Sequence, residues 1–122
     1  MKNVGKTQKN FDIDVEYGRQ GENYLLDILE TKRIEVKTDR IAHITGNVAV
    51  EYRYKGRPSG ISTTEADYWA FLLYDMTTII MVPTDKLKAI AREKYKQDQI
   101  TLGGDENASE MILIPINELT KP

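Results

Sequence analysis

The sequence predicts an α/β (α+β) fold in which helices flank a mixed central β-sheet. Two segments place apolar residues at helical spacing, several short segments alternate apolar and polar residues, and two segments are almost continuously apolar. The chain has 122 residues, enough for one domain but too few for a second core. We therefore expect one domain at residues 11–122, preceded by a loose polar tail at residues 1–10.

The first half of the chain is expected to contain a strand, a helix and a pair of strands. Residues 11–15 alternate apolar and acidic, as in a short strand, and two glycines then indicate a turn. Residues 20–30 place leucines and an isoleucine at helical spacing. Residues 32–39 and 47–54 both alternate with period two, so we expect them to pair as the antiparallel arms of a hairpin.

The second half is expected to add further strands and one helix to the same sheet. The continuous apolar character of two strands is typical of central strands that are covered on both faces. The expected elements are, in order, a loop at 55–60, central strands at 66–74 and 78–83, a helix capped by Thr84, and strands at 100–102 and 111–116.

Composition excludes several classes of function. The 17 Lys and Arg against 19 Asp and Glu leave a net charge of −2, which argues against binding nucleic acid through overall positive charge. The chain has no cysteine and one histidine, His43, so any metal would have oxygen ligands. It has no apolar run of about 20 residues and no apolar signal segment. We expect no membrane association and a cytoplasmic location.

A group of charged residues is expected to converge on the polar face of the predicted hairpin. Glu35, Lys37 and Asp39 alternate along one strand and therefore share a face. The hairpin registers that bury the valines of both arms put Glu51 on that face as well. Glu22 lies on the helix stripe that is expected to face the sheet.

Several carboxylates beside one lysine favour a hard divalent cation. Repulsion among the carboxylates destabilises the fold unless a cation or a proton compensates it. Mg²⁺ or Mn²⁺ binds carboxylates and water, and then phosphate. Metal-bound water can supply the nucleophile, while Lys37 orients or deprotonates it and offsets transition-state charge. The alternatives are a solvated strand face for Glu35 and Lys37, and stabilisation by the helix dipole for Glu22.

These residues resemble the PD-(D/E)XK (restriction-endonuclease-like) nuclease superfamily, in particular its small phage-encoded members. The resemblance rests on Gly21-Glu22 at a helix start, on Ile34-Glu35-Val36-Lys37, and on residues 45–52, 56–61 and 63–69. It implies a restriction-endonuclease-like core and Mg²⁺-dependent cleavage of DNA in phage replication, recombination or processing, in the host cytoplasm. It also implies that Glu35 is a metal ligand, Lys37 the catalytic lysine and Glu22 the helix acid.

One feature of the superfamily pattern is missing. Its members usually carry a metal-binding Asp between the helix acid and the acid-x-Lys strand. Between Glu22 and Glu35, the only acidic residues of this chain are Asp27 and Glu30. Asp27 is turned roughly 140° from Glu22 around the helix, so we interpret it as a solvated residue. The missing ligand is then expected to be Glu51 or Asp39.

Two basic regions are candidates for substrate contact. A polar loop is expected to hold the phosphate backbone without reading sequence, through Lys55, Arg57, Ser59, Thr63 and Thr64. The second helix has a basic face formed by Lys86, Lys88, Arg92, Lys94 and Lys96. We interpret that face as solvated, with contact to a second DNA segment as the alternative. The small size of the domain favours a homodimer on a duplex.

Two other functions compete with the nuclease. The first is a non-catalytic module that binds nucleic acid or a protein on the same fold. The second is a two-carboxylate glycoside hydrolase, which Lys37 between the acids and the expected lack of several exposed aromatic residues disfavour.

Overall fold

A computed structural model of the chain describes residues 4–122, with side chains from residue 12 onward. Its contacts divide the chain into two units, Met1–Lys32 and Arg33–Pro122. The predicted class is confirmed, because the chain combines α-helices with a mixed and an antiparallel sheet. No helix within the described residues has both the length and the apolar character needed to span a membrane.

The first unit consists of one long helix, α1 (Val4–Thr31). It includes the helix predicted at residues 20–30. The loose tail at residues 4–10, the strand at 11–15 and the glycine turn are wrong, because α1 runs through all three segments. Residues 1–3 of the predicted tail lie outside the described residues. Phe11 and Val15 are four residues apart, so a five-residue alternation also fits one face of a helix.

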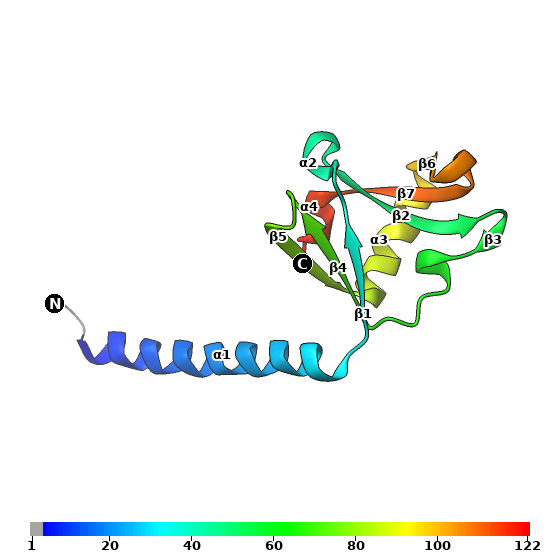
Figure 1. Cartoon of the computed structure of the whole chain (residues 1–122). Helices are drawn as coiled ribbons and strands as arrows, with labels where there is room; N and C mark the ends of the chain where they lie inside the picture. Colours follow the sequence, from blue (N-terminus) through cyan, green and yellow to red (C-terminus); the bar gives the residue numbers. More distant parts are fainter. Residues whose placement is uncertain (1–3) are drawn as a thin grey trace. The chain divides into compact units, whose positions relative to one another are not determined.

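Two β-sheets form the second unit (Figure 1). In the mixed sheet, β4 (Tyr68–Leu73) lies between β1 (Ile34–Thr38), which is parallel to it, and β5 (Thr78–Pro83), which is antiparallel. The antiparallel sheet has the order β3 (Arg57–Pro58), β2 (Asn47–Tyr54), β7 (Ser109–Pro115) and β6 (Ile100–Gly103). The strands expected at 100–102 and 111–116 are therefore confirmed, but the single central sheet is not.

The predicted hairpin of residues 32–39 and 47–54 is wrong. Both segments are strands, but β1 pairs with β4 and β2 pairs with β7 and β3. A short helix, α2 (Ala42–Thr45), turns the chain between them. Val48 and Val50 lie opposite Ile114 and Ile112 on β7. The main partner of each strand is thus distant in sequence: β4 for β1 and β7 for β2.

The helix predicted after Pro83 is confirmed as α3 (Thr84–Lys96), which contacts β4, β5 and β7 and so packs against both sheets. Its cap differs from the prediction. Thr84 is the first helical residue, and its hydroxyl donates to the carbonyl of Ala66 at 2.7 Å instead of capping the helix. The core between α3 and the sheets is built mainly from Trp69, Phe71, Leu73, Leu87, Val48, Val50 and Ile114. A C-terminal turn of helix, α4 (Ile116–Leu119), packs against α3 and β7.

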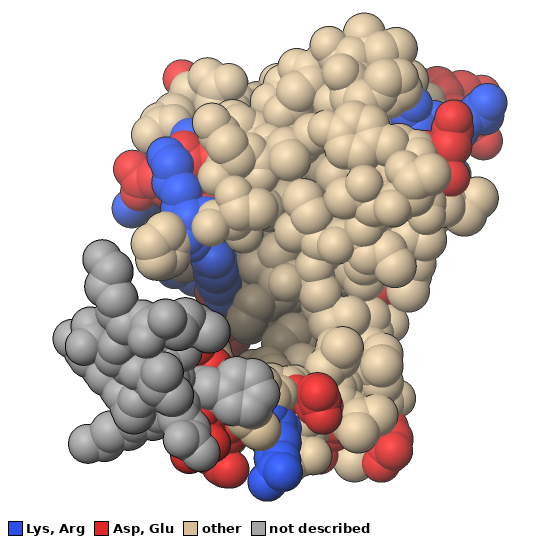
Figure 2. Space-filling view, turned by 90° about the vertical axis from the view of Figure 1, so that its left-hand side faces the viewer, with Lys and Arg blue, Asp and Glu red and all other residues tan. Residues whose placement is uncertain are grey.

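The second face of the mixed sheet is open in part. β4 is buried as predicted, but β5 is an edge strand, and the side chain of Ile79 is 61% exposed. On the side that carries β5 in Figure 1, the second unit shows a broad stretch without charged side chains (Figure 2). The prediction that both apolar strands are covered on both faces therefore holds for β4 alone.

Candidate functional site

The predicted catalytic pair lies on β1. The ammonium of Lys37 is 3.0 Å from a carboxylate oxygen of Glu35. The two side chains are 47% and 43% exposed, so both groups are within reach of a solute. Their i, i+2 spacing places them on one face of the strand. The structure thus brings Glu35 and Lys37 together as an exposed ion pair.

The partners of this pair are aromatic. In the parallel register, Glu35 lies beside Trp69 and Lys37 beside Phe71. The ammonium of Lys37 is 5.6 Å from the centroid of the Trp69 ring, within the range of a cation–π contact. The indole N–H of Trp69 is buried and has no acceptor among the described residues. The predicted polar face of β1 is thus the face that continues into the aromatic core.

The expected convergence of carboxylates is not observed. Glu51 lies on β2, in the other sheet, and accepts a hydrogen bond from the Ser109 hydroxyl at 2.6 Å. The prediction that Glu51 lies opposite Glu35 is therefore wrong, because it depended on pairing β1 with β2. Asp39 follows β1 and accepts the backbone N–H groups of Ile41 and Ala42 at 3.0 and 2.8 Å. Its carboxylate thus supports the start of α2.

The helix acid belongs to the other unit. Glu22 lies on α1, is exposed, and is followed on the same helix by Asp27. A carboxylate oxygen of Asp27 accepts a hydrogen bond from Thr31 at 3.2 Å. Within the described residues, no group of three or more His, Asp or Glu side chains is arranged to hold a metal ion. Any metal bound by the second unit would therefore depend on few protein ligands.

The predicted substrate loop divides into an exposed tip and an anchored base. Lys55 and Arg57 lie at the exposed turn between β2 and β3. Thr64 accepts the backbone N–H of Ala66 at 3.1 Å. Thr63 ends the short helix that follows the loop, and the hydroxyl of Ser59 is buried without a partner among the described residues. Of this set, Lys55, Arg57 and Thr63 are exposed to solvent, whereas Ser59 and Thr64 are partly buried.

The loop base is fixed against β2. The N–H of Ser59 and the hydroxyl of Ser62 both donate to the carbonyl of Tyr52, at 3.1 and 2.8 Å. Gly60 has a φ of +54°, and a Cβ at this position would overlap the main-chain oxygen of Glu51. Glycine is therefore required for the close approach of loop and strand.

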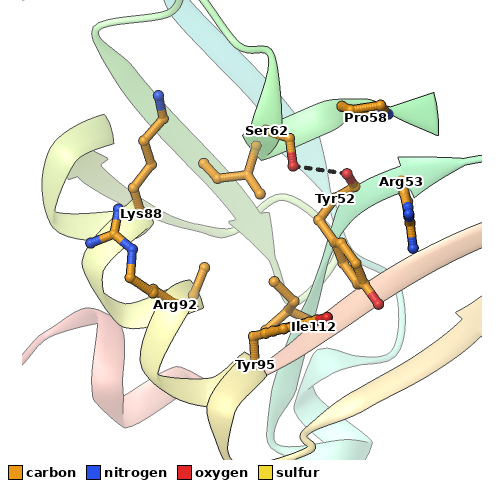
Figure 3. A pocket seen from close by; sticks show the side chains of 10 residues that line it. Tyr52, Arg53, Pro58, Ser62, Lys88, Arg92, Tyr95 and Ile112 are labelled. Carbon is orange, nitrogen blue, oxygen red and sulfur yellow. Dashed lines mark hydrogen bonds between the residues drawn. The ribbon is translucent and has the colours of Figure 1, made fainter.

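This packing forms one wall of a cleft between α3 and β2 (Figure 3). The cleft has a volume of about 640 Å³. Lys88 and Arg92 lie on the α3 side, and Tyr52 and Arg53 on the β2 side. The remaining lining residues are Pro58, Ile61, Ser62, Ala91, Tyr95 and Ile112.

The two tyrosines of the cleft are in contact. The ring centroids of Tyr52 and Tyr95 are 5.4 Å apart at an interplanar angle of 74°, an edge-to-face arrangement. Burial raises the pKa of Tyr52, and the nearby carboxylate of Glu110 raises it further. Glu110 also accepts a hydrogen bond from the Tyr52 hydroxyl at 3.5 Å and lies 3.8 Å from the Arg53 guanidinium. Tyr52 therefore stays a neutral hydroxyl donor at neutral pH.

The sequence contained part of the signal for this cleft. Lys88, Arg92 and Lys96 recur every four residues and therefore lie along one side of α3. The basic face of α3 is predicted to be solvated, but two of its cations, Lys88 and Arg92, line the cleft. The contribution of Tyr52 and Arg53 could not be predicted, because it depends on packing α3 against a strand that is far away in sequence. Comparison of the chain with protein families, curated proteins and solved structures finds no significant match.

Proposed function

We propose that the chain is a metal-dependent nuclease that hydrolyses phosphodiester bonds in DNA. The observation that carries the proposal is the exposed Glu35–Lys37 pair, an acid and an amine 3.0 Å apart on one strand face. Phosphodiester hydrolysis needs an oxygen ligand for a hard cation and a positive group for the developing charge. This pair contains both.

The donor set fits Mg²⁺ or Mn²⁺ bound largely through water and substrate. Mg²⁺ usually keeps several waters and binds through one or two carboxylates together with phosphate oxygens. Glu35 offers a half-exposed carboxylate for this purpose. When bound, the ion would activate a water molecule for attack on phosphorus.

Lys37 has a separate role in this proposal. In the structure its ammonium is held by Glu35 and by the face of the Trp69 ring. If a cation bound Glu35, the ammonium would be free to turn to a phosphate oxygen. The buried ring would limit the directions open to the lysine and so keep its ammonium close to Glu35.

The test is cleavage of labelled linear, nicked, flapped and four-way DNA by the full chain with Mg²⁺, Mn²⁺ or chelator. We expect strand breaks with either metal and none with chelator. Absence of cleavage on all four substrates with both metals would overturn the proposal.

A second candidate is a nucleic-acid-binding module without catalytic activity. The observation that favours it is the absence, within the described residues, of a group of three metal-ligating side chains. Titration with Mn²⁺ separates the two functions. The nuclease should bind Mn²⁺ and lose that binding in Glu35→Gln, whereas the module should bind nucleic acid equally well with and without the metal.

A further inference from the structure

We infer that the cleft between α3 and β2 binds one nucleotide of a single-stranded nucleic acid. Lys88 and Arg92 would hold its phosphate, and the rings of Tyr52 and Tyr95 would contact its base. The choice of a nucleotide among anionic ligands rests on the proposed function. The attraction of an anion to the cleft does not depend on the Glu35–Lys37 pair, which lies on another strand.

The charge of the cleft favours an anion. Arg53, Lys88 and Arg92 line it, and no Asp or Glu of the described residues does. Arg53 is partly neutralised by Glu110, at 3.8 Å. Neither Lys88 nor Arg92 has an ion-pair partner among the described residues. The α3 side of the cleft is therefore positive and uncompensated.

The positions of these cations on the helix are unfavourable without a ligand. Lys88 and Arg92 are four residues apart on α3, and like charges at this spacing destabilise a helix. Lys96 continues the series by one more turn. A bound phosphate between the first two would reverse the sign of this interaction, because each cation would then face a negative group.

The other surfaces of the cleft suit an aromatic ring. Ile61, Ala91 and Ile112 supply apolar surface, and the two tyrosines supply rings. Tyr95 is 50% exposed, so its ring is accessible to a ligand. Stacking of bases on aromatic side chains is a common means of binding single strands without sequence preference. The cation side and the ring side together match a phosphate and its base.

The size and rigidity of the cleft agree with one nucleotide. Its volume of about 640 Å³ lies in the range typical of small-ligand sites. A base can enter such a cleft only when it is unstacked and unpaired, which favours a single strand over a duplex. The hydrogen bonds of Ser59 and Ser62 to the carbonyl of Tyr52 hold the loop wall in place. A preformed wall lowers the ordering cost of binding.

The experiment measures binding of a fluorescently labelled single-stranded oligonucleotide of about 12 nucleotides to the full chain, by anisotropy, in chelator. Lys88→Gln and Arg92→Gln each remove one cation from the cleft. We expect each to weaken binding by about tenfold, because each loses a charge-assisted contact to phosphate. Tyr95→Ala should weaken binding by a similar factor. Tyr95→Phe keeps the aromatic ring and should bind as the unmodified chain does.

The matched control is Lys86→Gln, which removes the same charge from the same helix at a position that does not line the cleft. We expect it to bind as the unmodified chain does. Equal losses in Lys86→Gln, Lys88→Gln and Arg92→Gln would overturn the inference, because they would show attraction by overall charge. Unchanged binding in Lys88→Gln and Arg92→Gln would also overturn it. Circular dichroism and thermal melting of every variant verify folding, and Lys88→Arg, which keeps the positive charge, should retain binding.

A competition arm separates the parts of the ligand. A mononucleotide that displaces the oligonucleotide more effectively than inorganic phosphate supports contact with both phosphate and base. Equal displacement by the two would overturn the assignment of the base to the tyrosine side. Displacement by neither, even at high concentration, would overturn the inference of a single-nucleotide site.

This experiment and the cleavage assay fail independently. Binding in chelator contains no hydrolytic step, so it does not depend on whether the chain is a nuclease. Cleft-dependent binding without cleavage at any metal concentration would contradict the proposed function alone. Metal-dependent cleavage with cleft variants that bind normally would contradict the nucleotide site alone.

Discussion

The charged face of β1 and the cleft beside α3 differ in whether their positive charges have acidic partners. On β1, the one ammonium is neutralised by a carboxylate of the same strand, 3.0 Å away. In the cleft, Lys88 and Arg92 have no acidic partner among the described residues. The Glu35–Lys37 pair has no net charge, so it attracts a phosphate only when a further cation is bound beside it. The second region can attract a phosphate by itself.

This difference indicates that the groups suited to the reaction and the groups suited to binding lie in different regions. A neutral acid–amine pair is suited to a reaction that needs both groups, but contributes little to long-range attraction. An uncompensated cationic cleft is suited to holding a strand, but no carboxylate of the described residues lines it to bind a metal ion. A nuclease with both regions would bind through one and react at the other.

The largest effect is expected from the β1 pair. Glu35→Gln and Lys37→Met should each lower the rate of metal-dependent DNA cleavage by about 100-fold or more, because each removes one of the groups that the reaction requires. Oligonucleotide binding in chelator should remain unchanged. Gel-based cleavage rates and anisotropy measure the two quantities.

The control for this prediction is Glu65→Gln. Glu65 forms an ion pair of the same length with Arg33, and the side chains of both residues are exposed. Its loss should leave the cleavage rate within about twofold, since exposed ion pairs contribute little. A rate for Glu35→Gln equal to that of Glu65→Gln would remove the distinction between the two regions.

The next effect concerns the loop that forms one wall of the cleft. Gly60→Ala should destabilise the fold by about 2 kcal/mol, because a non-glycine residue is strained at positive φ and its Cβ would overlap β2. Denaturant unfolding measures this change. We also expect weaker oligonucleotide binding in Gly60→Ala, because this loop forms one wall of the cleft. Gly18→Ala is the comparison, because a Cβ there meets no atom within 4 Å and alanine favours the helix.

A smaller effect is expected in the salt dependence of binding. For single strands, each phosphate contact contributes about 0.7 to the slope of log affinity against log salt. Arg92→Gln should therefore lower the magnitude of that slope by about 0.7, whereas Glu35→Gln should not lower it. Anisotropy titrations at four or so salt concentrations determine the slopes. A slope unaffected by Arg92→Gln would show that this guanidinium makes no phosphate contact.

The smallest effect concerns pH. Burial and the carboxylate of Glu110 raise the pKa of Tyr52 above its ordinary value of 10.0, so the folded chain holds the phenol proton more tightly than the unfolded chain. The resulting stability is fully present below pH 10 and is lost as the pH rises through the folded pKa. Tyr52→Phe should therefore lose less stability than the unmodified chain above pH 10. Thermal melting at a series of alkaline pH values measures it, and parallel curves would contradict the pKa assignment.

Local patterns in the sequence predicted most elements of the second unit. The helix after Pro83 and the strands at residues 100–102 and 111–116 were correctly predicted, because their period and their flanking residues agree. The long helix α1 was only half predicted. Its first half contains a five-residue alternation that also fits a strand, and Gly18 and Gly21 follow shortly after it.

The pairing of strands could not be predicted in the same way. The alternation of residues 32–39 and 47–54 correctly indicated strands, and their closeness in sequence suggested a hairpin. The hydrophobic effect is not directional and favours whichever partner buries the larger apolar surface. For Val48 and Val50 those partners lie on β7, more than sixty residues further along the chain. This choice moved Glu51 away from Glu35.

The sequence by itself determined the α+β class, the oxygen character of any metal site, and the adjacency of Glu35 and Lys37, since a strand has a fixed period of two. Only the tertiary structure decided which carboxylates approach that pair and which cations share a cleft. Lys88 and Arg92 line the same cleft as Tyr52 and Arg53 because α3 packs across both sheets. Local periodicity specifies the faces of an element, whereas the contacts between faces depend on the packing of the whole core.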